Sequence, residues 1–144
     1  FRYLSVHVSE ATPSLLEDVA PVLPGDGVKV HVWAGSVGCQ ATPHFDYEDN
    51  VFTQLRGEKR FVLFPPKEQA RFAMHPLLHP SWRQGQVFDP TAHGTLFSDV
   101  LLGNGTLGAE AFEVVLRPGD VLYVPSYWLH WVTALSPSIS FNLW

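Results

Sequence analysis

Short segments rich in β-branched and aromatic residues, separated by Gly and Pro, recur along the chain and predict β-strands. Residues 2–8 (RYLSVHV) and 28–35 (VKVHVWAG) are two such segments. Between them, residues 12–20 (TPSLLEDVA) predict a short helix with Pro in its first turn and a Ser/Glu capping box. Residues 138–144 (SISFNLW) alternate strictly and predict the last strand.

The middle of the chain predicts more strands. The segment from residue 42 is interpreted as a hairpin: a strand, a turn at RGE, the strand KRFVLF and a stop at PP. Residues 67–74 predict one or two helical turns, and 75–108, rich in Pro, Gly and His, predict mostly loop. Residues 112–125 read as strand, RPGD turn and strand. Short strands with Gly/Pro turns and few helices predict an all-β jelly roll.

The composition bears on the number of domains, the cellular location and membrane association. A chain of 144 residues that is 46% hydrophobic predicts a single domain over residues 1–144, and its start at Phe1 allows it to be part of a longer protein. It has one cysteine, Cys39, so no internal disulfide forms, which favours an intracellular location, cytoplasmic or nuclear. No apolar run approaches the roughly 20 residues that cross a bilayer, so no membrane association is expected.

The net charge of the chain indicates which kinds of binding partner suit it. The formal net charge is −5, and the chain has no basic run or stripe. This weighs against a nucleic-acid surface built on phosphate contacts. A Lys/Arg-rich peptide suits an acidic protein better.

Three residues form a candidate metal site. His44 and Asp46 are two positions apart, so on one strand their side chains share a face. His130, in VPSYWLHWV, is the candidate third ligand. Two histidines and one carboxylate form the facial triad that leaves positions open on non-haem Fe(II). The alternative for a histidine among aromatic residues is a core position with a satisfied hydrogen bond.

Further polar residues fall around this pair. Asn50 has the same strand parity as His44 and is expected on the same side. Lys59 follows the turn on a neighbouring strand, and Asn142 shares a face of the last strand with Ser140. For Lys59 the alternative is a solvated charge at the end of a hairpin.

Three separate blocks of the sequence resemble the Jumonji C (JmjC) and cupin-like family of Fe(II)- and 2-oxoglutarate-dependent oxygenases, and they occur in the same order. The blocks are TPHFDYEDNVFTQLRGEKRFVLFPP, HPLLHPSWRQGQVFDP and RPGDVLYVPSYWLHWV with SFNLW. Within it they most resemble the branch of the asparaginyl hydroxylase that inhibits hypoxia-inducible factor. The resemblance implies a double-stranded β-helix with a few short helices. It implies Fe(II) on His44, Asp46 and His130, and 2-oxoglutarate bound by Lys59 with Asn50 and Asn142.

Other positions follow from the same resemblance. Tyr3 is similar to a tyrosine that contacts the distal carboxylate of 2-oxoglutarate. Relatives usually carry Thr or Ser three residues before the first metal histidine, where this chain has Ala41, with Thr42 next to it. A shift of one residue on a strand changes the face, so Thr42 contacts the cosubstrate only if a bulge restores its position. Arg83 and Gln84 match the segment that approaches the target side chain; the alternative is an exposed loop pair.

The resemblance implies a dioxygenase that uses Fe(II), 2-oxoglutarate and dioxygen to hydroxylate a protein side chain, with release of succinate and CO2. One alternative is an N-methyl-lysine demethylase or an RNA-modifying hydroxylase of the same family. Another is a cupin-like binding domain without turnover. The expected partner is a protein or peptide substrate, and a homodimer would form through segments outside this chain.

Overall fold

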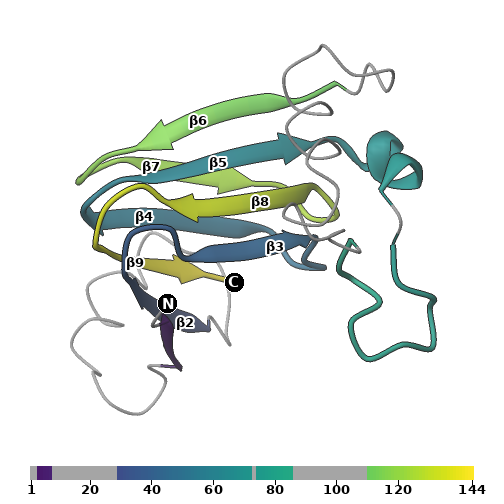
Figure 1. Ribbon diagram of the computed structural model, residues 1–144, viewed down its shortest axis with the longest axis horizontal. Helices are drawn as coiled ribbons and strands as arrows, with labels where there is room; N and C mark the ends of the chain where they lie inside the picture. Colours follow the sequence, from purple (N-terminus) through teal and green to yellow (C-terminus); the bar gives the residue numbers. More distant parts are fainter. Residues whose placement is uncertain (1–2, 8–28, 73, 86–109) are drawn as a thin grey trace.

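Two antiparallel sheets facing each other make up the fold (Figure 1). A computed structural model describes residues 3–7, 29–72, 74–85 and 110–144. In the five-stranded sheet the order is β1 (Tyr3–His7), β2 (Val30–Gly35), β9 (Ser138–Leu143), β4 (Asn50–Arg56) and β7 (Val121–Val124). In the four-stranded sheet it is β3 (Gln40–His44), β8 (Leu129–Ala134), β5 (Lys59–Phe64) and β6 (Phe112–Leu116).

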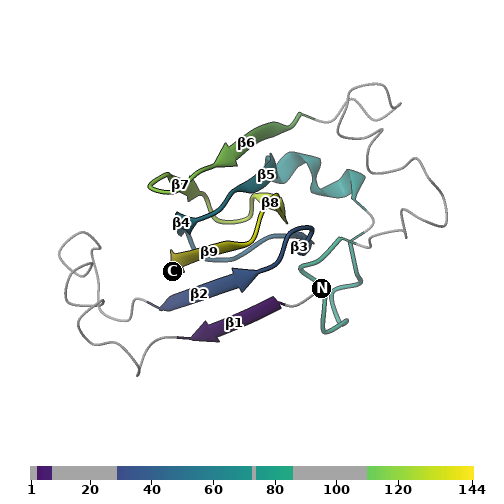
Figure 2. The ribbon, with the colours of Figure 1, turned by 60° about the vertical axis from the view of Figure 1, so that its left-hand side comes forward.

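The all-β jelly-roll prediction is confirmed. Strands form in the predicted segments 2–8, 28–35, 112–125 and 138–144, whereas the strand β8 was not predicted. The strand β1 is the outer edge of its sheet, next to β2 (Figure 2). After the PP pair the chain makes a short 3-10 helix, η2 (Pro66–Arg71), with proline in its first turn, which fits the one or two predicted turns. The predicted helix at 12–20 lies outside the described residues, as does most of the predicted 75–108 loop. None of the helices in the described ranges is long and apolar enough to span a bilayer.

The predicted hairpin is wrong in two respects. Its first strand is divided into β3 and β4, which lie in opposite sheets. β4 pairs with β7 and β9, whereas β5 pairs with β6 and β8, so the two strands belong to opposite sheets. Gly57 makes this crossing: its φ is +71°, and a Cβ there would lie 2.2 Å from the Pro137 carbonyl oxygen. The turn therefore carries the chain from one layer to the other instead of returning it along the same sheet.

The space between the sheets is apolar at some positions and polar at others. Phe45, Phe64 and Leu129 belong to one buried cluster, and Phe52 and Phe61 to another. Polar side chains also lie inside, at less than a tenth of their full exposure: Asn50, Gln54, Lys59, His130, Ser138, Ser140 and Asn142. Because buried polar groups reduce stability unless they have partners, their accumulation here marks the interior as a site.

Candidate functional site

Two strand ends bring the predicted metal ligands together. His44 is the last residue of β3, and His130, near the start of β8, is its partner across the ladder. Their ring centroids are 4.2 Å apart. Asp46 follows two residues later, and one ligand atom from each of the three residues lies within 4.8 Å of the others. The sequence therefore identified a compact cluster of two imidazoles and one carboxylate.

The prediction that His44 and Asp46 share a strand face is wrong. Asp46 does not lie on the strand with His44, because β3 ends at His44, and the ladder with β8 is irregular between Ala41 and His44. Strand alternation therefore does not place the carboxylate. The backbone of Asp46 is held by Tyr127, whose N–H donates to the Asp46 carbonyl oxygen at 2.8 Å.

Both imidazoles are oriented by backbone carbonyl groups. His44 Nδ1 lies 2.7 Å from the Thr42 carbonyl oxygen, and His130 Nδ1 lies 3.0 Å from that of Trp128. A carbonyl oxygen only accepts hydrogen bonds, so each Nδ1 carries the proton. The lone pair of each ring is then on Nε2, which is the usual arrangement of metal-binding histidines.

The charges of the cluster also suit a cation. Burial, and then the neighbouring His44, lower the pKa of His130 to about 3, so this imidazole is neutral at pH 7. Asp46 Oδ2 is buried, 3.7 Å from His130 Nε2, and accepts no hydrogen bond from the residues the structure describes. A buried carboxylate oxygen without a donor is costly unless a cation binds it. The donor set therefore fits a divalent metal ion.

A pocket extends from these three residues between the sheets, with an empty volume of about 570 Å³ that includes its open mouth. Both sheets line it: Trp33, Gly35, Cys39, Ala41, His44, Asp46, Asn50, Phe52, Lys59, Phe61, His130, Val132, Ala134, Asn142 and Trp144. The pocket is thus mostly apolar, with a few polar groups, which is typical of sites for small molecules.

Lys59 is the only lysine or arginine among the described residues that line the pocket. It is 6% exposed, its Nζ donates to Ser140 Oγ at 2.5 Å, and it lies 5.1 Å from the centroid of the Phe52 ring. Burial lowers the pKa of Lys59 to about 8, against an opposing effect of Cys39. The solvated-hairpin alternative is therefore wrong, and the pocket contains an ammonium group that no carboxylate in the described structure neutralises.

Asn50 and Asn142 also line the pocket, although parity with His44 is not the reason. Asn50 is on β4 and His44 on β3, in opposite sheets. Asn142 donates to Asn50 Oδ1 at 3.1 Å and accepts from Trp33 Nε1 at 2.6 Å, so both ends of its amide are fixed. Trp33 was not predicted as a site residue, although its alternating position within the β2 segment was an available signal.

The fold and the site can now be compared with known proteins. A family described as a cupin-like domain matches residues 4–144. The chain belongs to this cupin-like domain family. A structure of E. coli ycfD shares the fold of this cupin-like domain, with a TM-score of 0.63 at 20% identity, over 98% of this chain and 32% of that one.

Two named proteins are similar to this chain in sequence. HSPB1-associated protein 1 from Homo sapiens is 33% identical over 128 residues, 83% of the cupin-like chain and 24% of that protein. tRNA wybutosine-synthesizing protein 5 from Danio rerio is 32% identical over 108 residues, 75% of this chain and 30% of that protein. The chain thus spans about a quarter to a third of the length of these relatives.

Thr42, Arg83 and Gln84, which the sequence also predicted as site residues, lie outside the pocket lining of this cupin-like domain. Thr42 is exposed, and Ala41 lines the pocket in its place, so the irregularity in β3 does not bring the Thr42 hydroxyl inward. Tyr3 lies in β1 opposite Gly35 of β2, and its side chain is not part of the described structure.

Arg83 and Gln84 are exposed. Gln84 forms an isolated bridge with His44. An Arg83 guanidinium nitrogen lies 3.7 Å from Asp46 Oδ1. The predicted pair is therefore beside the metal cluster, although it is outside the pocket lining.

The buried charge of Lys59 predicts a dependence of stability on pH. The pKa falls from 10.5 in the unfolded chain to about 8 in the folded one, so between these values the unfolded state binds more protons, and stability rises with pH. Below pH 8 both states are protonated and the destabilisation is complete, about 3 kcal/mol. Lys59→Met should therefore be more stable than the wild type at pH 7, and this advantage should shrink by pH 10.

Urea unfolding at pH 7 and pH 10 measures this difference. Lys29→Met, at an exposed lysine, is the control, and it should change stability by less than about 0.5 kcal/mol. A Lys59→Met variant that is less stable at pH 7, or whose advantage does not change with pH, would contradict the burial of this charge.

Proposed function

We propose that the chain is an Fe(II)- and 2-oxoglutarate-dependent dioxygenase domain that hydroxylates a protein side chain. One observation carries the proposal: a two-histidine, one-carboxylate cluster lines the same pocket as a buried lysine. The cluster suits Fe(II) with open coordination positions, and the lysine suits an anionic group of a small cosubstrate.

The register gives the separation of the two features. Lys59 pairs with Ala134 on β8, four positions along the strand from His130. At the rise of an antiparallel strand this places the two backbone positions about 13 Å apart. A lysine side chain extended into the pocket and a five-carbon dicarboxylate together match this distance. 2-Oxoglutarate therefore fits with its distal carboxylate on Lys59 and its keto acid end toward His44, Asp46 and His130.

Each residue has a simple role in this proposal. His44, Asp46 and His130 hold the metal, with their rings fixed by backbone carbonyl groups. Lys59 neutralises the cosubstrate, and the apolar walls exclude water from it. When bound, iron and 2-oxoglutarate supply the oxidation, in which one oxygen atom of O2 enters a C–H bond and the other enters succinate, with loss of CO2.

A protein substrate is supported by three observations. The chain is acidic, its segment HPSWRQGQVFDP resembles the asparaginyl hydroxylase branch, and one relative is named for association with another protein. An RNA substrate is the second candidate, because another relative is named for tRNA wybutosine synthesis. The absence of a basic stripe in the sequence favours the protein. The complete triad weighs against a binding domain without turnover.

The proposed metal ligands can be tested by metal analysis. After anaerobic loading with Fe(II) and desalting, the wild type should retain close to one equivalent of iron. Asp46→Ala removes the charged ligand and His130→Ala removes a buried one, so both should lose most of it. His79→Ala, at an exposed histidine in the 74–85 segment, is the control and should keep its iron. Full iron occupancy in either ligand variant would overturn the assignment.

The activity is tested by measuring succinate released from 2-oxoglutarate, with and without peptide and RNA libraries, and by mass spectrometry of the products. A gain of one oxygen on a peptide side chain is the expected product. Lys59→Met should raise the Michaelis constant for 2-oxoglutarate by at least about 100-fold, because a buried carboxylate without its partner costs about 3–5 kcal/mol.

Other products decide between the alternatives. Formaldehyde with loss of methyl groups would support a demethylase, and oxidised RNA would support the second candidate. An unchanged Michaelis constant in Lys59→Met would remove Lys59 from the cosubstrate site. A wild type that binds iron but releases no succinate would contradict dioxygenase activity.

A further inference from the structure

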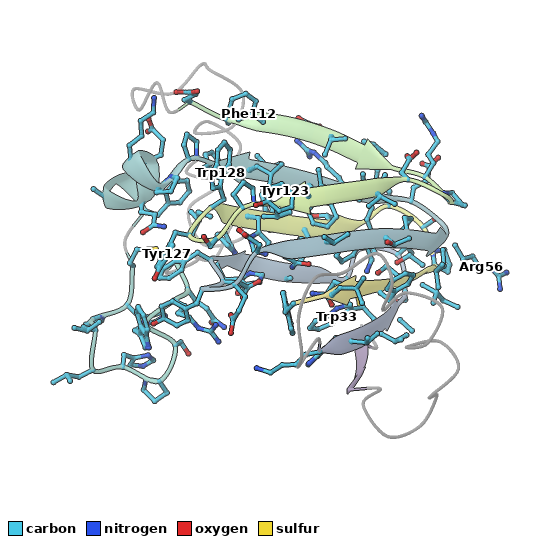
Figure 3. The ribbon with its side chains drawn as sticks, turned by 180° about the vertical axis from the view of Figure 1, so that it is seen from behind. Trp33, Arg56, Phe112, Tyr123, Tyr127 and Trp128 are labelled. Atoms are coloured by element: carbon cyan, nitrogen blue, oxygen red, sulfur yellow. The ribbon has the colours of Figure 1, made fainter. Side chains whose placement is uncertain are left out.

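Four aromatic rings pack together beside the metal cluster: Phe45, Tyr47, Trp82 and Tyr127. Their centroids lie 5.4–6.0 Å apart in five pairs, mostly with edge-to-face or tilted geometry. Phe45 and Tyr47 flank Asp46 in the chain, so this aromatic cluster adjoins the candidate metal residues. Figure 3 shows Tyr127 at the end of the strands opposite Arg56.

Part of the aromatic cluster is open to solvent. Phe45 is buried and forms its base, whereas Tyr47 and Tyr127 are 41% and 46% exposed. Single exposed aromatic residues are common, but two packed against each other beside a candidate active site form a surface that suits binding.

The backbone of Tyr127 gives an independent indication of function. Its φ is +64°, and it is the only residue other than glycine with positive φ in the described structure. The conformation is held on both sides, because the Tyr127 N–H donates to the Asp46 carbonyl oxygen and Gln69 Nε2 donates to the Tyr127 carbonyl oxygen, at 2.8 and 2.5 Å. Strained residues fixed in this way occur preferentially at functional sites. Glycine would relieve the strain but would not present a ring.

The charges around the aromatic cluster are mainly negative. Asp46, Glu48 and Asp49 occur within one short loop that contains no Lys or Arg. The Asp49 carboxylate accepts from the Ser126 N–H at 2.9 Å, whereas exposed Glu48 has no cationic partner among the residues that the structure describes.

One cation already contacts these rings. The guanidinium of Arg83 lies 5.5 Å from the centroid of the Tyr47 ring, which shows that this ring accepts a cation. The exposed Tyr127 ring is left for a second one.

We propose that the aromatic cluster binds an Arg or Lys side chain of the substrate peptide, next to the residue that reaches the metal. The cation lies on the exposed Tyr127 ring, where the π electrons attract it, and Glu48, next to Tyr47 in the acidic loop, supplies the opposite charge. This rests on the proposed function, because it assumes that the peptide enters the pocket. RNA bases would also stack on such rings, but Glu48 and Asp49 repel phosphates.

Peptide display tests the proposal without turnover. The probe is a library of random 12-residue peptides, selected on the immobilised Mn(II)-loaded chain without 2-oxoglutarate. Peptides bound to the wild type should be enriched at least about threefold in Arg and Lys over the input, as expected for cation–π and charge attraction. Glu48→Gln and Tyr127→Gly should each reduce this enrichment. Tyr127→Gly should fold well, because glycine adopts positive φ without strain.

Glu113→Gln is the matched control. It makes the same change of charge on β6, where Glu113 is exposed and pairs with Arg60, and it should keep the enrichment. No enrichment in the wild type, enrichment that persists in both test variants, or preferential binding of a labelled single-stranded RNA would overturn the proposal. Succinate release without Arg/Lys enrichment would contradict only this inference, whereas enrichment without succinate release would contradict the dioxygenase function.

Discussion

The antiparallel pairing of β3 with β8 is the interaction on which the candidate site depends. It sets His44 opposite His130 across one ladder, and the carbonyl groups two residues before each histidine fix the protonated ring nitrogens. A shift of one residue in this register would turn one imidazole to the other face of the sheet. Because β8 also pairs with β5, the register of that second pairing fixes the position of Lys59 relative to His130.

The interior holds polar groups that a purely structural core would avoid. Lys59 keeps its charge at pH 7 despite burial, with one hydroxyl partner and one aromatic ring as neighbours. The side-chain amide of Asn142 accepts a hydrogen bond from Trp33 Nε1 and donates one to Asn50 Oδ1, so both of its polar ends have partners. The result is a mostly apolar pocket with the buried ammonium group of Lys59 at one end and the cluster of His44, Asp46 and His130 at the other.

Local patterns in the sequence predicted part of this arrangement, and contacts between distant segments determine the rest. The β-branched segments predicted most of the strands, and the family resemblance predicted His44, Asp46, His130 and Lys59 as site residues. The pairing could not be inferred in the same way. Gly57 resembles a hairpin turn because its local conformation is that of a turn, and only the far contact with Pro137 shows the crossing between sheets. The aromatic cluster was likewise hidden, because Phe45, Trp82 and Tyr127 come from three distant segments.

The central claim is that one pocket binds a divalent metal and 2-oxoglutarate together. Calorimetric titration of 2-oxoglutarate into the chain, first with Mn(II) and then after chelation, tests it most directly. If the keto acid end binds at the metal and the distal carboxylate at Lys59, binding with Mn(II) should be stoichiometric and at least about tenfold tighter than without it, a difference of about 1.4 kcal/mol. Equal affinity with and without metal, or no binding in either case, would contradict the account.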